Sequence, residues 1–225
     1  MNRKELAKYI DHTNLKPTAT EKDIITLCEE ANEYGFASVC VNPRYVEVAK
    51  HHLNEMESKV KVVCVIGFPL GENAQEMKAM EAVFAAQAGA DELDMVISIS
   101  AVKNKDYEYV YEEVKRVVDC TNIPVKAIIE ICKLTDEEIV KACEVCMDAG
   151  VKFVKTSTGF AESGATQEAV KLMADTVAGV CEVKASGGIK TLENMYDMIC
   201  AGATRIGTSS GVSIINEFDA KKSKN

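Results

Sequence analysis

The sequence predicts a TIM (β/α)₈ barrel with a short N-terminal helix, formed as a single domain over residues 1–225. Short apolar runs rich in β-branched residues alternate with longer segments of helical period along almost the whole chain. Eight such runs recur at intervals of roughly 24 to 33 residues, which is the length of one strand–helix unit. A chain of 225 residues also suits a compact barrel, and eight consecutive units favour a closed parallel barrel over an open sheet.

The predicted strands follow one another from the N-terminus to the C-terminus. The eight ranges are Ile10–Thr13, Ala37–Val41, Val60–Ile66, Glu92–Ile97, Val125–Glu130, Phe153–Thr156, Val180–Ala185 and Thr204–Ile206. Capping pairs mark helix starts between them, such as Thr20 with Asp23 and Thr135 with Glu138. Residues 74–88 place five apolar side chains on one face of an amphipathic helix: Met77, Met80, Val83, Phe84 and Ala88.

Glycines at the ends of predicted helices indicate where the strands end. Four of them stand where a left-handed residue closes a helix and leads straight into a strand: Gly35, Gly89, Gly150 and Gly202. The residues five positions further on are Cys40, Asp94, Lys155 and Gly207. If the units are built alike, these four residues share one level near the C-terminal ends of the strands, where barrels of this kind have their active sites. The alternative is a coincidence of similar strand lengths.

Two lysines inside predicted strands indicate imine chemistry. Lys155 and Lys184 both follow apolar strand residues and precede a turn that contains glycine. Lysine is rarely buried unless it is paired or used in a reaction. On neighbouring strands the two amines would lie within about 4–6 Å, so mutual repulsion and desolvation would lower a lysine pKa and leave one amine uncharged. Such an amine can attack an aldehyde and form a Schiff base.

Asp94 is expected to face the same end of the barrel from the fourth strand. It could hold the second ammonium group or relay protons to and from the carbinolamine and the substrate hydroxyl. The alternative is a buried network of lysine and aspartate that only fills the barrel. Two lysines at matched heights on adjacent strands favour the catalytic interpretation.

Glycine and hydroxyl residues cluster after the last three predicted strands. The three segments are Ser157-Thr158-Gly159, Ser186-Gly187-Gly188 and Gly207-Thr208-Ser209-Ser210-Gly211. Backbone N–H groups at such turns bind phosphate without needing a cation, and the loops after strands seven and eight are the usual phosphate position in these barrels. Tight turns also favour glycine and serine, so simple turn formation is the alternative.

The composition excludes several other classes of function. A net charge of −9 argues against a nucleic-acid groove or an anionic membrane surface as the main partner. No signal peptide and no membrane span are expected, and nine scattered cysteines are typical of a reducing compartment, so the predicted location is the cytoplasm. Cys143 and Cys146 favour helical packing over zinc or redox chemistry. The three histidines offer no spaced set of metal ligands: His12, His51 and His52.

Taken together, the motifs resemble the bacterial deoxyribose-phosphate aldolase family over roughly residues 5–215. The matching segments include Ile10-Asp11-His12-Thr13, Val39-Cys40-Val41-Asn42-Pro43, Gly67-Phe68-Pro69-Leu70-Gly71, Glu92-Leu93-Asp94-Met95-Val96, Phe153-Val154-Lys155-Thr156-Ser157-Thr158-Gly159, Val183-Lys184-Ala185-Ser186-Gly187-Gly188 and Arg205-Ile206-Gly207-Thr208-Ser209-Ser210. The resemblance implies reversible cleavage of 2-deoxy-D-ribose 5-phosphate to D-glyceraldehyde 3-phosphate and acetaldehyde, a step of deoxyribonucleotide breakdown. It implies no metal and no organic cofactor.

The resemblance also implies roles for particular residues. Lys155 would form the Schiff base with C1 of the sugar, and Lys184 and Asp94 would set its pKa and relay protons. The implied substrate-binding residues are Asp11, Cys40 and Thr158. The implied phosphate-binding residues are Gly159, Gly187, Gly188, Gly207, Ser209 and Ser210. A small phosphorylated aldehyde or sugar is the expected partner, together with further copies of the chain in a homodimer or homotetramer.

Some positions depart from the family pattern. Asn14 replaces a leucine, Ser98 stands where asparagine is common, and the tail to Asn225 lacks the C-terminal tyrosine that some members use in proton transfer. These differences leave the catalytic rate and the fine substrate preference open. Two alternatives also stay open, namely a Schiff-base aldolase for another small phosphorylated sugar and a barrel that binds phosphosugars without turnover.

Overall fold

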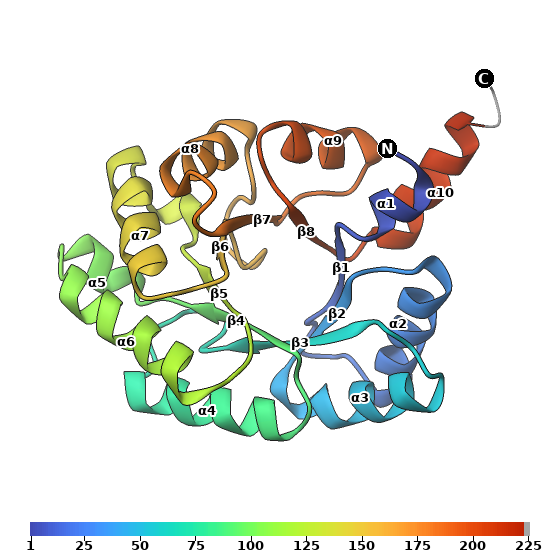
Figure 1. Cartoon of the computed structure of the whole chain (residues 1–225), viewed down its shortest axis with the longest axis horizontal. Helices are drawn as coiled ribbons and strands as arrows, with labels where there is room; N and C mark the ends of the chain where they lie inside the picture. Colours follow the sequence, from blue (N-terminus) through green and yellow to red (C-terminus); the bar gives the residue numbers. More distant parts are fainter. Residues whose placement is uncertain (223–225) are drawn as a thin grey trace.

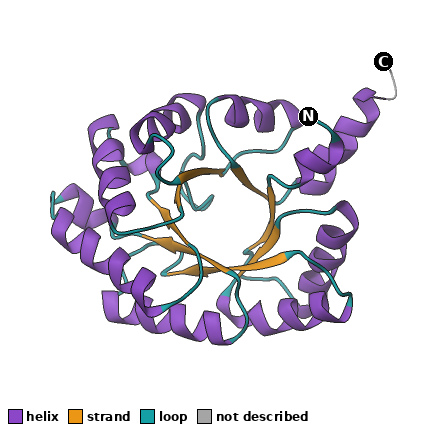
Figure 2. Cartoon of the chain, in the orientation of Figure 1, coloured by secondary structure: helices purple, strands orange, loops and turns teal. Residues whose placement is uncertain are grey.

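The computed structural model describes residues 1–222. Eight parallel strands pair in chain order, and the barrel closes because the first strand also pairs with the last. Figures 1 and 2 show the helices arranged around the outside of this ring of strands. The predicted (β/α)₈ barrel is therefore confirmed. The expectation about a C-terminal tyrosine concerns residues 223–225, which lie outside the described part of the chain.

All eight predicted strands are present, with ends within two residues of the predicted ones. They are β1 (Ile10–Asn14), β2 (Ser38–Val41), β3 (Lys61–Ile66), β4 (Glu92–Val96), β5 (Val125–Ile128), β6 (Phe153–Lys155), β7 (Glu182–Ser186) and β8 (Arg205–Thr208). Their pairing places Lys155 of β6 directly beside Lys184 of β7. The register therefore brings the two lysines of the predicted site to the same level of the barrel.

Ten α-helices and two short 3₁₀ turns connect the strands of the described chain. The helices are α1 (Arg3–Ala7), α2 (Glu21–Tyr34), α3 (Val46–Glu55), α4 (Gln75–Gln87), α5 (Ile99–Lys103), α6 (Tyr107–Cys120), α7 (Asp136–Asp148), α8 (Gln167–Val177), α9 (Leu192–Cys200) and α10 (Gly211–Lys222), and the 3₁₀ turns are η1 (Pro43–Tyr45) and η2 (Ile131–Lys133). The short helix α1 is the predicted N-terminal helix, and Asn2 caps it with a capping box.

The predicted caps are present at both ends of the helices. The side chains of Thr20 and Thr135 each accept a hydrogen bond from the backbone N–H of the third helical residue, and the acidic side chain of that residue accepts one from the backbone N–H of the cap. The four glycines that were expected to close helices all have positive φ, from 73° to 114°. An L-residue with a side chain rarely adopts this conformation, so glycine sets the point where each helix ends.

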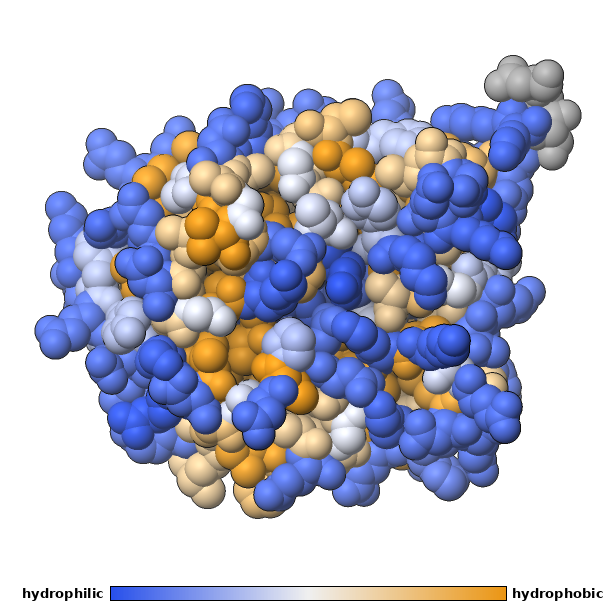
Figure 3. All heavy atoms as spheres, viewed as in Figure 1, coloured by the Kyte–Doolittle hydropathy of each residue, from blue (hydrophilic) through white to orange (hydrophobic). Residues whose placement is uncertain are grey.

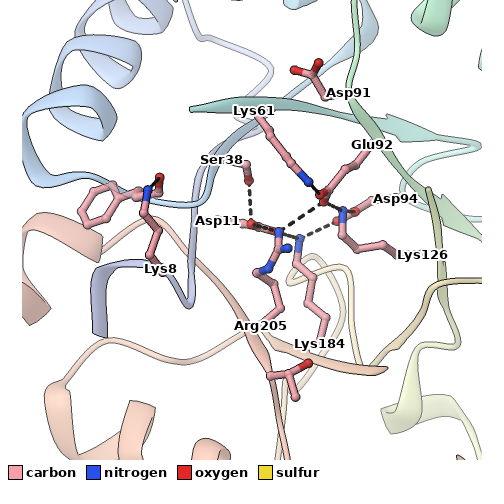
Figure 4. Close-up of polar contacts among 12 residues, drawn as sticks. Lys8, Asp11, Ser38, Lys61, Asp91, Glu92, Asp94, Lys126, Lys184 and Arg205 are labelled. Carbon is pink, nitrogen blue, oxygen red and sulfur yellow. Dashed lines mark hydrogen bonds and ion pairs between the residues drawn. The ribbon is translucent and has the colours of Figure 1, made fainter. Parts of the chain in front are cut away.

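The barrel interior is apolar on one side and charged on the other. Near β2 and β3 it holds a small cluster made of Leu15, Cys40, Val63 and Val65. From β4 to β8, and on β1, the inward positions instead carry buried acids and bases, several of which are drawn in Figure 4. The large apolar core lies between the strands and the surrounding helices. The strands therefore carry the charged side chains inward, into the space where the site forms.

Three of the five apolar residues that share one face of α4 are exposed. An amphipathic helix normally packs its apolar face on the core, yet Met77, Met80 and Phe84 are 55%, 53% and 66% exposed. The small residues Ala82 and Ala85 pack inward instead, which lets the helix approach the barrel closely. Apolar surface accordingly reaches the outer edge of the molecule over α4, at the bottom of Figure 3. We refer to these three exposed residues as the outer stripe of α4.

A buried ion pair explains why this inner face of α4 is not wholly apolar. Lys78 of α4 and Glu113 of α6 are both fully buried, and their charged atoms are 2.6 Å apart. The ammonium group also donates to the backbone carbonyl of Val96, at the end of β4. A lysine on the inner face of a helix lowers the difference in polarity between its two faces, so apolar periodicity does not show which face of α4 packs on the barrel.

Among residues 1–222, no helix is long and apolar enough to cross a membrane.

Candidate active site

Two lysines and one aspartate meet inside the barrel, where Asp94 and Lys184 lie in the middle of β4 and β7 and Lys155 ends β6. The Nζ atoms of Lys155 and Lys184 each donate to Oδ2 of Asp94, and both distances are 2.7 Å. The two nitrogens are therefore no farther apart than twice that distance. All three side chains are buried. The sequence predicted this juxtaposition, which depends on one carboxylate oxygen that both amines share.

The surroundings shift the pKa values of the two lysines in opposite directions. Burial lowers the pKa of Lys155, and the neighbouring ammonium group of Lys184 lowers it further, while Asp94 opposes both. The net result is a lowered pKa. Burial also disfavours the charged form of Lys184, but Asp11 and Asp94 outweigh it and raise the pKa of Lys184 above its ordinary value. Lys155 is thus the amine that loses its proton first, and desolvation contributes more to this than repulsion does.

Asp94 is held in its ionised form. Burial alone would raise the pKa of Asp94, but the cationic side chains of Lys126, Lys155 and Lys184 hold it well below its ordinary value. An ionised carboxylate accepts hydrogen bonds and donates none. Asp94 can therefore orient both amines and attract protons, while the ammonium group of Lys184 is the adjacent proton donor.

A cavity of about 500 Å³ opens above Lys155 at the C-terminal end of the barrel. Lys155 lines this cavity, although only 3% of the residue is exposed. Asp94 and Lys184 are fully buried and lie outside its lining. A molecule bound in the cavity would therefore meet the amine of Lys155 first, with the acid and the second lysine behind it.

The glycine and hydroxyl turns border the same cavity. Five of the six predicted phosphate-binding residues line it: Gly159, Gly187, Gly188, Gly207 and Ser209. Ser210 does not line it, and its backbone N–H donates to the hydroxyl oxygen of Thr208. Gly187 has a φ of 85°, and an added Cβ would lie 2.9 Å from the Cα of Gly164. A side chain at residue 187 would thus both strain the turn and push the neighbouring loop.

The three predicted substrate-binding residues occupy different places. Thr158 lines the cavity, and its hydroxyl and backbone N–H both donate to the carboxylate of Glu130. Asp11 is fully buried below the cavity and accepts hydrogen bonds from Ser38 and Lys184. Cys40 is 1% exposed, and burial raises the pKa of its thiol to about 11. Neither Asp11 nor Cys40 borders the cavity, and only Asp11 holds one of the two lysines, Lys184, by a hydrogen bond.

Several neighbouring residues were not singled out from the sequence. Lys16 and Lys190 line the cavity, so its border includes cations as well as backbone N–H groups. Lys190 follows the Gly187-Gly188 turn by two residues, so its closeness to this predicted phosphate turn could have identified it from the sequence. Glu92 and Arg205 join the buried charges below, where Arg205 bridges Asp11 and Glu92. Glu92 and Arg205 stand two positions before Asp94 and Gly207, and alternate residues of a strand point to the same side, so the sequence could have predicted that they point inward.

Two departures from the family pattern have distinct positions. Asn14 lines the cavity at the end of β1, where its side chain is available to a bound molecule. Ser98 caps α5, because its hydroxyl accepts from the N–H of Ala101. Its own N–H donates to Glu113. Of these two departures, Asn14 is therefore the one that borders the cavity.

The remaining candidates take part in packing. Cys143 and Cys146 are both buried on the inner side of α7. Within residues 1–222, no group of three or more His, Cys, Asp or Glu side chains is placed to hold a metal ion.

Comparisons with known proteins show the family of the chain. A model of the DeoC/LacD family aldolases matches residues 6–217. Deoxyribose-phosphate aldolase of Thermococcus kodakarensis is 57% identical over 218 residues, which cover 96% of this chain and 97% of that protein. The corresponding aldolase of Listeria welshimeri is 55% identical over 214 residues, covering 94% and 95%.

Solved structures of aldolases share the fold. The structure described as "QR15, an Aldolase" has a TM-score of 0.92 and 47% identity, and the match covers 97% of this chain and 98% of that one. The tetrameric deoxyribose phosphate aldolase of Aeropyrum pernix has a TM-score of 0.91 and 35% identity, covering 98% and 93%.

Proposed function

The chain belongs to the DeoC/LacD family of aldolases, and we propose that Lys155 is the lysine through which it reversibly cleaves 2-deoxy-D-ribose 5-phosphate. The products are D-glyceraldehyde 3-phosphate and acetaldehyde. The observation that carries this proposal is the position of Lys155, a buried lysine with a lowered pKa on the lining of the cavity. The deoxyribose-phosphate aldolases that match almost the whole chain support the choice of substrate.

The first step joins the amine to the aldehyde carbon. The lone pair of neutral Lys155 attacks C1 of the open-chain sugar, and the carbonyl oxygen becomes the hydroxyl of a carbinolamine. This hydroxyl leaves as water once it has gained a proton, which gives a protonated imine. The ammonium group of Lys184 is the nearby proton donor, and Asp94 stabilises the positive charge that forms on the nitrogen of Lys155.

The second step breaks the bond between C2 and C3. A base removes the proton of the 3-hydroxyl, its oxygen forms the new aldehyde, and the electron pair of the C2–C3 bond moves into the imine. D-glyceraldehyde 3-phosphate leaves, and an enamine stays on Lys155. Protonation of C2 followed by hydrolysis of the imine releases acetaldehyde and restores the amine. Asp94 and Lys184 lie beside the nitrogen and relay these protons in our proposal.

The phosphate group binds at the turns that follow β6, β7 and β8. Backbone N–H groups of Gly187, Gly188 and Ser209 supply neutral donors at the cavity border, and α10 begins directly behind the last turn. Lys190 adds a positive charge at the same border. Binding of the phosphate here fixes the sugar so that C1 reaches Lys155.

Reductive trapping tests the proposal. With acetaldehyde and borohydride, we expect one reduced ethyl group per active site, because the trapped imine becomes a stable secondary amine. Peptide mass spectrometry should place it on Lys155, whose pKa is lowered, and leave Lys184, whose pKa is raised, unmodified. Trapping on Lys184 would reverse the roles of the two lysines, and the absence of any buried adduct would reject the imine mechanism.

Other phosphorylated sugars provide the matching specificity control. A panel of small phosphorylated aldoses and ketoses should show the highest kcat/KM with 2-deoxy-D-ribose 5-phosphate. A clear preference for another sugar would keep the imine chemistry and replace the substrate. Binding without turnover would favour a phosphosugar-binding barrel.

We also propose that the chain forms a homo-oligomer through the outer stripe of α4, and that it works in the cytoplasm. Met77, Met80 and Phe84 are spaced three and four residues apart, which is the spacing of helices that pack against each other. Each of the three is more than half exposed in the single chain. A solved relative is described as tetrameric, which supports a second copy as the occupant of this face.

Replacement of Phe84 by glutamate should shift the oligomer toward smaller species. A charge buried in an interface without a partner costs several kcal/mol of association free energy. Val180 is 74% exposed between α8 and β7, across the barrel from α4 in Figure 1. Val180→Glu introduces the same charge there and should leave the assembly unchanged. Sedimentation velocity distinguishes the two variants, and equal behaviour of Phe84→Glu and wild type would contradict an interface at α4.

A further inference from the structure

Six charged side chains inside the barrel form a closed ring of alternating charge. In order around the ring they are Lys184, Asp11, Arg205, Glu92, Lys126 and Asp94. Neighbouring charged atoms around the ring are 2.5 to 3.2 Å apart. Figure 4 shows these six side chains pointing toward one another; Glu92 and Asp94 both come from β4, and each of the others comes from a strand of its own. We call this arrangement the charge ring.

The charge ring contains equal numbers of acids and bases. Its three carboxylates each touch two of its three cationic side chains, so its formal charge is balanced. Lys155 lies outside the ring and touches only Asp94, through the oxygen that Asp94 also offers to Lys184. A proton on Lys155 would therefore add a buried positive charge with no carboxylate of its own. Desolvation makes such an unpaired charge costly.

Arg205 and Lys126 of the charge ring also contact one aromatic ring and share one carboxylate. The guanidinium carbon of Arg205 lies 5.2 Å from the centre of the aromatic ring of Phe153, and the ammonium nitrogen of Lys126 lies 5.7 Å from it. A cation over an aromatic face is attracted by the ring quadrupole. Glu92 holds both cations on its Oε2, and its Oε1 accepts from Lys61, which is half exposed. Arginine also keeps its charge at every accessible pH.

We propose that Arg205 and Glu92 are positioning residues, which balance the charge ring so that Lys155 is the one uncharged amine of the site. This inference rests on the proposed imine at Lys155. Neither residue contacts Lys155, so both act through Asp11, Lys184, Lys126 and Asp94. The charged and titratable side chains that face Lys155 are Asp94 of β4, Lys184 of β7 and Cys40 of β2, with Lys126 of β5 and Asp11 of β1 behind them.

The number of charges left in the ring predicts that substitutions of Arg205 and Glu92 shift the pH midpoint of trapping in opposite directions. Arg205→Met leaves three carboxylates facing two ring cations, so Lys155 should hold its proton more tightly. We expect the pH midpoint of reductive trapping by acetaldehyde and borohydride to rise by about one unit, as a unit charge several ångströms away would produce. Addition of Glu92→Gln to this variant restores the balance and should return the midpoint toward the wild-type value.

If Arg205 and Glu92 had a purely structural role, the double variant would be affected at least as strongly as Arg205→Met alone. Loss of both partners would then damage the site at least as much as loss of one. Arg205→Lys keeps the charge and should keep the wild-type midpoint. In Arg205→Met, Asp11 retains Ser38 and Lys184 as partners, and Glu92 retains Lys61 and Lys126. No carboxylate is left alone, so we expect the variant to fold, and thermal unfolding measures this directly.

The outcomes separate this inference from the proposed function. Trapping of wild type on a residue other than Lys155 would reject the proposed imine. Trapping of wild type on Lys155, combined with an unshifted midpoint in Arg205→Met or a double variant shifted further than the single one, would reject the balancing role alone. If Arg205→Met does not fold, Lys126→Met removes a cation from the same charge ring, and Glu92→Gln should restore its midpoint by the same argument.

Discussion

Replacement of Lys155 by alanine is expected to reduce aldol turnover on the order of 10⁵-fold or more, since the variant has no nucleophile for the substrate. The reduced ethyl adduct should disappear with it. Asp94 would keep hydrogen bonds from Lys126 and Lys184, so no buried carboxylate loses all its partners. The glycine turns do not involve Lys155, and binding of phosphate esters should therefore persist. Steady-state kinetics and calorimetric titration with a phosphate ester measure the two properties separately.

Lys152 provides the matched control for this experiment. It lies just before β6, at the other end of the strand from Lys155, and pairs with Glu182 at the surface. Lys152→Ala should retain full turnover and normal trapping. Appreciable turnover in Lys155→Ala would mean that another amine forms the imine, whereas loss of phosphate-ester binding would mean that the substitution had disturbed the whole cavity.

Replacement of Lys184 by leucine should lower turnover at neutral pH about 100-fold and move the pH midpoint of imine formation upward by about one to two units. The sign follows from the charges around Lys155. Its pKa is lowered, so the reactive neutral form appears as the pH rises through that value. Removal of the ammonium group of Lys184 removes a repulsion and leaves Asp94 to attract the proton of Lys155 more strongly. The pKa of Lys155 must then rise.

The pH dependence of trapping distinguishes this electrostatic effect from simple loss of packing. Lys184→Arg keeps a positive charge and should keep a lower midpoint than Lys184→Leu, even where its turnover falls. A variant with leucine that is still active and has the wild-type pH profile would contradict the electrostatic role of Lys184. Thermal unfolding of both variants shows whether the barrel tolerates the change, because Asp11 retains Arg205 and Ser38.

The sequence predicted the fold well because the barrel repeats one local unit. Capping pairs and left-handed glycines depend on neighbouring residues alone, so they located the ends of the strands to within two residues. The same regularity predicted that Asp94, Lys155 and Lys184 meet. Periodicity predicted an apolar stripe on α4 but does not show which side of a helix packs on the barrel, and Met77, Met80 and Phe84 of that stripe are exposed.

The parts of the site that escaped prediction depend on contacts between distant residues. Arg205 and Asp11 are separated by 194 positions, and their pairing follows only from the closure of β8 on β1. Cys40 shares the predicted level, yet its exposed fraction depends on how Leu15 and Val65 pack over it. Lys16 borders the cavity from a loop whose path no local pattern determines. The sequence thus predicts which strand carries a group better than which partner the group meets.

The charge ring has a consequence for fragments of this enzyme. Its members come from β1, β4, β5, β7 and β8, and the link between Asp11 and Arg205 spans the seam where the first strand meets the last. Neither half of the chain contains both Asp94 and a lysine from β6 or β7. A half-barrel expressed alone should therefore form strands without forming a nucleophile, and activity after denaturation should return only when the seam has closed.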